Sequence, residues 1–312
     1  MTRALLIHGG TLGDFVLSLR VVSALRASGA AHVSVLGRPA VCGIACPRGG
    51  VDEVRDIEAH GYHRLFSAES ELGEAAREWL AGFDLAVNML PDGDGVVSGH
   101  LKRAGVRAVI ELDPRPRPGT RRHITDQWLA AVQTEGILGG GDAPEIHIEA
   151  ALADRARAIL GERGTAGERT ILLAPGSGSR KKCWPAAEYL SLAFLAHRAG
   201  WMPVCLLGPV ERETFSDGER ASIGQSMPIL DGLTVIDLAA CLTVARAYVG
   251  NDSGVSHVAA AVGARVVAIF GPTDPAVWRP LGRRVRVAGG GDGANWPSVQ
   301  TVWQHVLEAI QC

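Results

Sequence analysis

The clearest strand–loop–helix unit of this chain lies at residues 170–199 and reads TILLA-PGSGSRKKCWP-AAEYLSLAFLAHRA. The first five residues, Thr170–Ala174, form an apolar run of the length expected for a buried strand. Pro185 can begin the helix that follows, because proline is tolerated in the first turn of a helix. Glycines and serines connect the two elements. This order of elements is the repeating unit of α/β proteins and indicates that fold class.

Short apolar runs and helical patterns alternate on both sides of this unit. We expect strands at residues 4–8, 32–36, 83–90, 107–112, 202–207, 246–250 and 265–270. Helices are expected at residues 14–27, 71–81, 125–134, 151–163, 186–199 and 299–310. Alternation of this kind predicts parallel sheets that carry helices on both faces.

Length and composition indicate two globular domains. The chain has 312 residues, which is enough for two domains of about 100–200 residues each. A glycine-rich break at residues 164–167 precedes the second run of alternating elements. We therefore assign residues 1–150 to a first domain and residues 151–297 to a second. The last helix, within residues 298–312, is left free to pack back on the first domain.

Charge and cysteine usage exclude several classes of protein. The formal net charge is -2, so the basic excess of a nucleic-acid-binding protein is missing. No apolar run approaches the length that spans a bilayer, and the apolar run at residues 4–7 is too short for a signal peptide. The six cysteines lie in apolar or motif contexts without the spacing of a metal site. We expect reduced thiols and a cytoplasmic protein.

The loop at residues 175–185 has the composition of a phosphate-binding site. Backbone N–H groups and hydroxyls of Ser177, Gly178 and Ser179 can donate hydrogen bonds to an anion. Lys181 and Lys182, two of only three lysines in the chain, follow directly. The loop does not have the Walker pattern. An ordinary turn is the alternative, but the two lysines favour anion binding.

A second loop with polar side chains follows the strand expected at residues 246–250. We expect a helix to begin near Ser253, and its N-terminal N–H groups favour a phosphate. The Asp252 carboxylate can accept hydrogen bonds from sugar hydroxyls. His257 would lie about one turn inside the helix, where a ligand contact and simple packing are both open. The pattern Gly-x-Ser-x-Gly of serine hydrolases is absent around Ser253.

Two further strand-end loops each carry a carboxylate. Asp14 follows Gly10-x-x-Gly13, at the start of a helix, where it can cap free N–H groups. The same position faces the ligand crevice of an open α/β sheet, so a catalytic role stays open. Glu211 follows the strand at residues 202–207 and can accept a hydrogen bond from ribose. Glu213 is the competing residue, and either one can instead occupy a first helical turn.

Together these stretches resemble glycosyltransferase family 9, the ADP-heptose:lipopolysaccharide heptosyltransferases. The matching stretches are Gly13-Asp14 and residues 175–185, 208–211, 250–257 and 270–275. The resemblance implies a GT-B fold, in which two Rossmann-like domains face each other across a cleft. It also implies inverting transfer of a heptose from ADP-heptose, with no metal or other cofactor. Another nucleotide sugar, a natural-product acceptor and a non-transferring enzyme such as an epimerase are the alternatives.

The resemblance also assigns roles to single residues. Asp14 is implied as the general base and Lys182 as the catalytic ligand of the diphosphate. The other implied donor contacts are Ser177, Gly178, Ser179, Glu211, Asp252, Ser253, Gly254 and His257. Sugar transfer needs a base for the acceptor proton and positive charge on the departing diphosphate, which agrees with these residue types. Domain closure is expected to join the two groups during the reaction.

The acceptor implied by the resemblance is an anionic glycan or glycolipid, such as a lipopolysaccharide core. Candidate contacts in the first domain are Gly13, Arg64, Arg121 and Arg122. A solvated surface position is the alternative for each arginine. No nucleic-acid partner is expected. We predict a cytoplasmic location and leave transient contact with the inner-membrane surface open.

Overall fold

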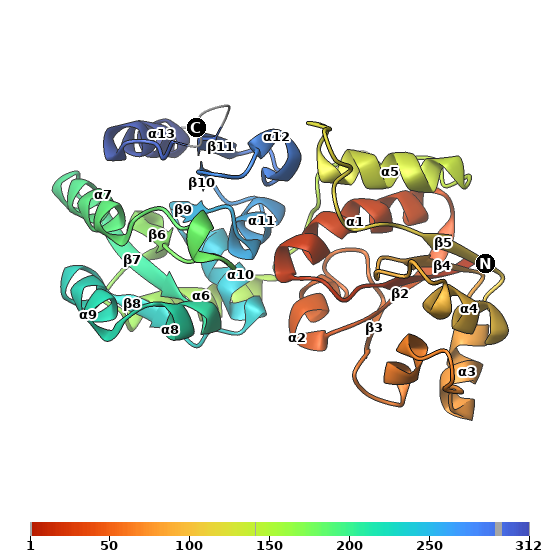
Figure 1. Cartoon of the computed structure of the whole chain (residues 1–312). Helices are drawn as coiled ribbons and strands as arrows, with labels where there is room; N and C mark the ends of the chain where they lie inside the picture. Colours follow the sequence, from red (N-terminus) through yellow and green to blue (C-terminus); the bar gives the residue numbers. More distant parts are fainter. Residues whose placement is uncertain (1, 141, 291–294, 312) are drawn as a thin grey trace. The chain divides into compact units, whose positions relative to one another are not determined.

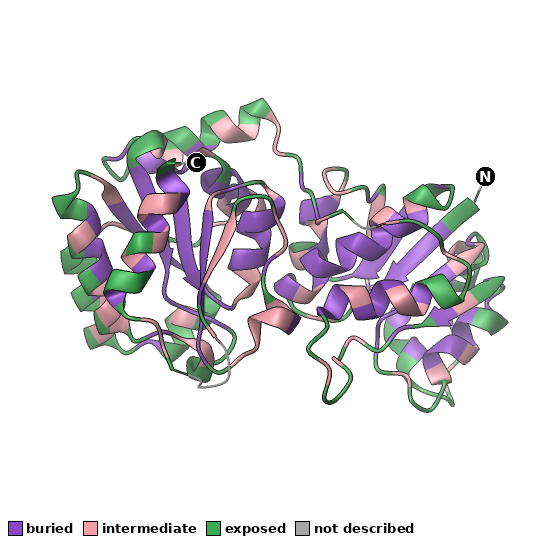
Figure 2. Cartoon of the chain, turned by 90° about the horizontal axis from the view of Figure 1, so that it is seen from above, coloured by how far each residue is buried: buried purple, intermediate pink, exposed green. Residues whose placement is uncertain are grey.

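The computed structural model describes residues 2–140, 142–290 and 295–311. The chain divides into two compact units, Met1–Pro144 and Glu145–Cys312 (Figure 1). This division lies a few residues before the one expected after residue 150. Each unit contains a single parallel sheet, and Figure 2 shows that buried residues concentrate on the strands and on the helix faces that cover them.

The first unit is built on a five-stranded sheet with the order β3-β2-β1-β4-β5. The strands are β1 (Thr2–Ile7), β2 (Ala30–Gly37), β3 (Glu53–Asp56), β4 (Leu85–Asn88) and β5 (Ala108–Glu111). All four pairings are parallel. The central strand β1 is buried from Ala4 to Ile7, as expected for a strand covered on both faces.

Helices cover both faces of the first sheet. The side chains of Leu5 and Ile7 in β1 pack in one core with α3 (Glu74–Ala81) and α4 (Val96–Arg103). Helices α1 (Leu12–Ala27) and α5 (Ile124–Thr134) contact each other elsewhere in this unit. The Arg20 guanidinium of α1 joins them, because it donates to Thr125 Oγ1 and to Asp126 Oδ1 at 2.6 Å each.

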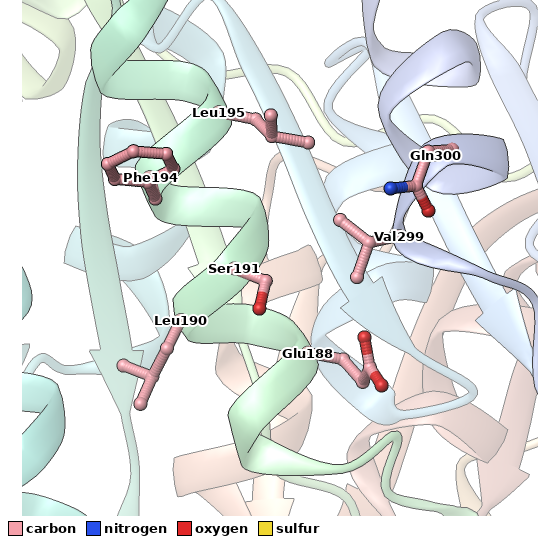
Figure 3. Close-up of a pocket in the computed structure, with 7 residues that line it drawn as sticks. All are labelled: Glu188, Leu190, Ser191, Phe194, Leu195, Val299 and Gln300. Carbon is pink, nitrogen blue, oxygen red and sulfur yellow. The ribbon is translucent and has the colours of Figure 1, made fainter.

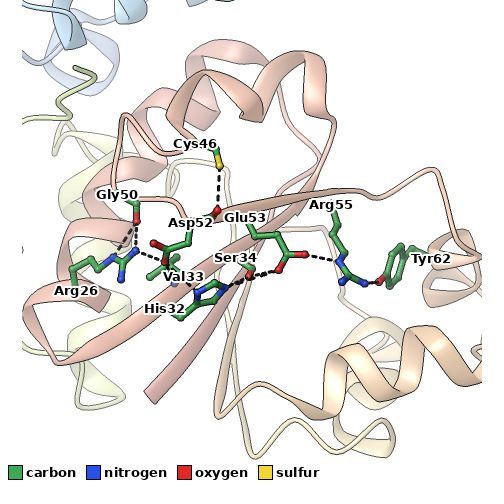
Figure 4. Close-up of polar contacts among 10 residues, drawn as sticks. All are labelled: Arg26, His32, Val33, Ser34, Cys46, Gly50, Asp52, Glu53, Arg55 and Tyr62. Atoms are coloured by element: carbon green, nitrogen blue, oxygen red, sulfur yellow. Dashed lines mark hydrogen bonds and ion pairs between the residues drawn. The ribbon is translucent and has the colours of Figure 1, made fainter. Parts of the chain in front are cut away.

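The edge strand β3 is held by charged and polar side chains (Figure 4). The Asp52 carboxylate accepts a 2.7 Å hydrogen bond from the Val33 N–H and pairs with Arg26. Burial alone would raise the pKa of Asp52, but the hydrogen bonds from the Val33 N–H and from Arg26 have the larger effect. The pKa of Asp52 is therefore lowered. Glu53 accepts a 2.7 Å bond from Arg55 Nε. The bond from Val33 of β2 to Asp52 thus anchors the start of this short strand, which has three charged residues, beside β2.

The second unit is built on a six-stranded sheet with the order β11-β10-β9-β6-β7-β8. The strands are β6 (Thr170–Ala174), β7 (Met202–Leu207), β8 (Ile229–Asp231), β9 (Ala247–Asn251), β10 (Val266–Phe270) and β11 (Val285–Gly289). All pairings are again parallel, so the loops that follow the strands leave the sheet at one edge.

One face of the second sheet forms a core with α7 (Ala186–Arg198), α9 (Asp217–Ser226) and α13 (Val299–Gln311). The other face carries α11 (Gly254–Ala261), which contacts α10 (Val235–Val244), and α10 in turn packs on α6 (Ala150–Gly161). Val302 and Val306 of α13 are fully buried in the first of these cores. The last helix therefore packs on the second unit, whereas the sequence left open a packing on the first domain. Cys312 lies outside the described residues.

The predicted strands and helices are present, with ends that differ by a few residues. Three strands were not predicted: β3, β8 and β11. Each lies at the edge of its sheet, where one side of the strand has no neighbour and less apolar surface is buried. Across the described part of the chain, we find no helix with both the length and the apolar character that crossing a membrane requires.

Candidate functional site

In the first unit, Asp14 lies in the first turn of α1, directly after the loop that follows β1. Its Oδ2 accepts hydrogen bonds from the Thr11 N–H at 3.2 Å and from Thr11 Oγ1 at 2.8 Å. The predicted capping role of Asp14 is confirmed. The side chain is only partly buried, so the cap leaves part of the carboxylate accessible.

His8 lies beside Asp14 and is not among the residues predicted from the sequence. The imidazole is 3% exposed and packs edge-on against Phe15, with ring centroids 5.3 Å apart. A Cβ placed on Gly10 would lie 3.1 Å from both His8 Cε1 and Asp14 Oδ2, so this glycine lets both side chains flank the loop. Burial lowers the pKa of His8 to about 4, although Asp14 acts in the opposite direction. The neighbour of Asp14 is therefore a neutral imidazole at pH 7.

In the second unit, the loops after β6 and β9 are bound to each other. The Ser177 hydroxyl donates to the Asp252 carbonyl at 2.7 Å. The Lys182 ammonium lies 2.9 Å from Asp252 Oδ2, in an ion pair. Three residues that the sequence predicted as separate donor contacts therefore form one cluster.

The ion pair between Lys182 and Asp252 has one buried and one accessible partner. The Asp252 side chain is 6% exposed, whereas the Lys182 side chain is 37% exposed. An ammonium group has three N–H donors, so Lys182 can keep its bond to Asp252 and still donate to an anion. Asp252 fixes the position of the positive charge. The pairing of these two side chains was not predicted from the sequence.

Glu211 lies against the loop that follows β6. Its Oε2 accepts a 2.6 Å hydrogen bond from the Gly208 N–H, at the start of α8 (Pro209–Thr214). A Cβ placed on Gly176 would lie 1.5 Å from Glu211 Oε1, so the carboxylate occupies the space that any larger residue at position 176 would need. Glu213 is exposed on α8. Of the two carboxylates left open by the sequence, Glu211 is therefore the one beside the predicted phosphate loop.

The remaining donor candidates belong to the same strand-end region. Ser253 takes the N-cap position of α11, and Gly254 is its first residue. His257 is 5% exposed, inside the first turn of that helix. Gly178 and Ser179 are exposed in the loop after β6. Their contacts with a donor stay predictions.

The candidate acceptor residues belong to different segments of the first unit. Gly13 is buried in the first turn of α1. Arg64 is exposed and donates to the Glu71 carbonyl at 3.0 Å, which braces a local turn. Arg121 and Arg122 are exposed in the segment between β5 and α5. Their role toward an acceptor also stays a prediction.

A groove of about 520 Å³ lies between α7 and α13 (Figure 3). It is lined by Glu188, Leu190, Ser191, Phe194, Leu195, Val299 and Gln300. These residues come from the sides of two helices, and none of them is a predicted site residue. Among the residues that the structure describes, no three His, Cys, Asp or Glu side chains lie close enough to hold a metal ion.

Comparison with protein families and curated proteins identifies relatives of the chain. The model of glycosyltransferase family 9 (heptosyltransferase) matches residues 103–303. Lipopolysaccharide heptosyltransferase 3 of Escherichia coli is 29% identical over 135 residues, which cover 42% of this chain and 40% of the relative. Lipooligosaccharide heptosyltransferase 2 of Haemophilus influenzae is 32% identical over 144 residues, 43% of this chain and 39% of the relative. The chain thus matches about two fifths of the length of these curated relatives.

Solved structures resemble the chain over almost its whole length. A glycosyl transferase family 9 protein from Veillonella parvula has a TM-score of 0.77 at 20% identity, covering 99% of this chain and 96% of that one. The ADP-heptose lps heptosyltransferase II of Escherichia coli has a TM-score of 0.75 at 20% identity, covering 100% and 99%. These likenesses confirm the predicted two-domain α/β fold of the GT-B class. Because the family model covers most of the sequence, from residue 103 to residue 303, the chain belongs to glycosyltransferase family 9.

Proposed function

We propose that this chain is an inverting glycosyltransferase that transfers a heptose from ADP-heptose to a hydroxyl of a lipopolysaccharide core or a related glycan. One observation carries the proposal. Three features lie together where β6, β7 and β9 end. They are the Lys182–Asp252 ion pair, the hydrogen bond of the Ser177 hydroxyl, and Glu211 beside Gly176. Membership of family 9 and the heptosyltransferase relatives support the sugar.

The cluster in the second unit suits a nucleoside diphosphate. Lys182 supplies positive charge, and the loop before it supplies hydroxyl and N–H donors to the oxygens that gain charge as the bond breaks. Glu211 is assigned to the ribose hydroxyls, because Oε2 is occupied by the Gly208 N–H and Oε1 faces the loop. Under this proposal the diphosphate is neutralised by the protein itself, without a metal ion.

The chemical step assigns Asp14 as the base. The acceptor hydroxyl gives its proton to the Asp14 carboxylate, and its oxygen forms a bond to the anomeric carbon. The bond from that carbon to the diphosphate oxygen breaks, and ADP leaves with the electron pair. Attack opposite the leaving group inverts the configuration. Because His8 is neutral at pH 7, it adds no positive charge beside this carboxylate.

The acceptor and the location are part of the same proposal. Exposed Arg64, Arg121 and Arg122 are assigned to an anionic glycan acceptor. The reaction is placed in the cytoplasm, where an acceptor carried by a lipid would bring the enzyme to the surface of the inner membrane.

Calorimetric titration with ADP tests the donor site. We expect Lys182→Ala to weaken ADP binding about 10- to 100-fold, since hydrogen bonds to charged groups contribute about 1.5–3 kcal/mol. Lys181→Ala is the matched control, because Lys181 is the exposed neighbour of the same type. Equal effects of the two substitutions would contradict the role of Lys182. Binding of UDP in preference to ADP would contradict the donor.

A further inference from the structure

Asn251 is the last residue of β9, and its side chain is fully buried at the start of the loop that follows this strand. Its Nδ2 donates to the Pro175 carbonyl at 2.8 Å and to the Gly176 carbonyl at 3.2 Å. Its Oδ1 accepts from the Trp184 N–H at 3.0 Å and from the Tyr189 hydroxyl at 3.1 Å, and it shares the proton of that hydroxyl with the Ala174 carbonyl, also at 3.1 Å. The side-chain amide thus uses both donors and both acceptor positions.

These contacts hold the two ends of the phosphate loop. Pro175 and Gly176 begin the loop, and Trp184 ends it, so a single side chain fixes both ends. The orientation of the amide follows from chemistry, because a carbonyl can only accept and must face the NH₂ group. The residues with charged or hydroxyl groups, Ser177 to Lys182, lie in the span between the two ends.

The next residue of the chain completes the arrangement. Asp252 accepts from Ser177 through its carbonyl and pairs with Lys182 through its carboxylate. Asn251 therefore sets the ends of the loop, while Asp252 sets two groups in its middle. A shift of β9 or of its last side chain would move the donors of the loop together.

We propose that Asn251 is a positioning residue for the donor diphosphate, which holds the loop at residues 175–185 in the shape that presents Lys182 and the N–H groups of the loop. The inference rests on the proposed function, since it assumes that this loop binds a nucleoside diphosphate. It assigns to Asn251 no contact with the donor. Its effect passes through the loop backbone.

The first unit offers a matched control in Asn88. Asn88 is the last residue of β4, which pairs with the first strand of its unit as β9 does in the second. It is also fully buried. Its Oδ1 accepts from the Leu90 N–H at 3.1 Å, and its Nδ2 donates to Asp92 at 3.4 Å. These bonds stay within the turn that follows the same strand.

The test compares Asn251→Asp with Asn88→Asp in the full chain. At position 251 the change places a carboxylate oxygen against two carbonyl oxygens and leaves Oδ1 in place. We expect ADP to bind at least about 10-fold more weakly to Asn251→Asp, a loss within the range of one charged hydrogen bond. ADP binding to Asn88→Asp should stay within about twofold of wild type. Amide hydrogen exchange at residues 176–184 should rise only in Asn251→Asp.

Several outcomes separate this role from a structural one. If both variants lose thermal stability and neither loses ADP affinity, Asn251 is a core residue only and the proposal is overturned. Unchanged exchange in the loop overturns it as well. Should Asn251→Asp not fold, Asn251→Ser is measured in its place against Asn88→Ser.

Nucleotide binding by the wild-type protein tests the donor assignment on its own. Wild-type protein that binds UDP or GDP instead of ADP contradicts the adenine of the proposed function, and the Asn251 comparison is then made with that nucleotide. Wild-type protein that binds none of the three contradicts the proposed function and, with it, the diphosphate role. Tight wild-type binding that Asn251→Asp leaves unchanged contradicts only the role of Asn251.

Discussion

Gly176→Ala is the substitution whose effect the structure defines most closely. The added Cβ would lie 1.5 Å from Glu211 Oε1, 2.2 Å from Cδ and 2.3 Å from Cγ. A small rotation of the Glu211 side chain cannot relieve the overlap of the added Cβ with three of its atoms. Either the Glu211 side chain leaves its place, or the loop moves against the bond that Asn251 makes to the Gly176 carbonyl.

The cost follows from the bond that is lost. When Glu211 moves, the 2.6 Å bond from the Gly208 N–H to Oε2 breaks, and α8 loses the carboxylate in its first turn. Helix caps of this kind contribute about 1 kcal/mol, and Glu211 is partly exposed, which keeps the cost near that value. We therefore expect Gly176→Ala to lower the free energy of unfolding by about 1–2 kcal/mol.

Denaturant unfolding of four variants measures this effect. Gly178→Ala is the control in the same loop, because, apart from the two chain neighbours, no atom of the described residues lies within 4 Å of a Cβ built there. It should change stability by less than about 0.5 kcal/mol. In the background of Glu211→Ala, where the obstructing side chain is gone, Gly176→Ala should cost almost nothing. The double-mutant cycle should then give a coupling of about 1 kcal/mol or more.

Equal costs of Gly176→Ala in the two backgrounds would refute the reasoning. So would a loss in Gly178→Ala as large as the loss in Gly176→Ala. The same cycle measured with ADP titration shows whether the contact matters for the donor. If Glu211 binds ribose, Gly176→Ala should weaken ADP binding, and Glu211→Ala should weaken it by a similar factor.

Three further predictions concern other parts of the molecule. Burial lowers the pKa of His8 to about 4, so as the pH falls below about 6.5 the imidazole is protonated in the unfolded chain before it is protonated in the folded one. Wild type should therefore lose about 2 kcal/mol more stability than His8→Leu between pH 7 and pH 5. Equal losses of the two proteins in urea unfolding would contradict this. Gly250→Ala should cost about 1–3 kcal/mol, because its Cβ would lie 2.0 Å from the buried Tyr248 hydroxyl, and an unchanged melting temperature would count against that packing. Arg26→Met should raise the pKa of Asp52 (Figure 4), and a carboxyl NMR titration identical to that of wild type would exclude the ion pair as a cause.

The central strands of both sheets were predictable from the sequence, whereas the edge strands β3, β8 and β11 were not. β6 and β7 have the predicted bounds, because central parallel strands are continuous apolar runs. β8 has only three residues, and β3 has the charged sequence EVRD. An edge strand of this kind is held by side-chain contacts such as those of Asp52, which involve residues far apart in the sequence.

The candidate site was predictable as a set of residue types but not as a set of contacts. The glycine, serine and lysine composition of the loop indicated anion binding, and a family resemblance gave roles to Lys182 and Asp252. Neither showed that these two residues pair with each other at 2.9 Å. The hydrogen bonds of Asn251 were not predictable either, because its four partners come from two other segments of the chain. The low pKa of His8 follows from the burial of its ring, which is known only from the structure.

Acceptor-dependent release of ADP from ADP-heptose tests the central claim most directly. The assay compares wild type with Asp14→Asn, whose amide oxygen can still accept the cap bonds from Thr11 while the base is gone. We predict that wild type releases ADP when a lipopolysaccharide-core acceptor is added, and that Asp14→Asn binds ADP normally but does not turn over. Wild-type rates in Asp14→Asn, or no release from ADP-heptose by wild type, would contradict the account.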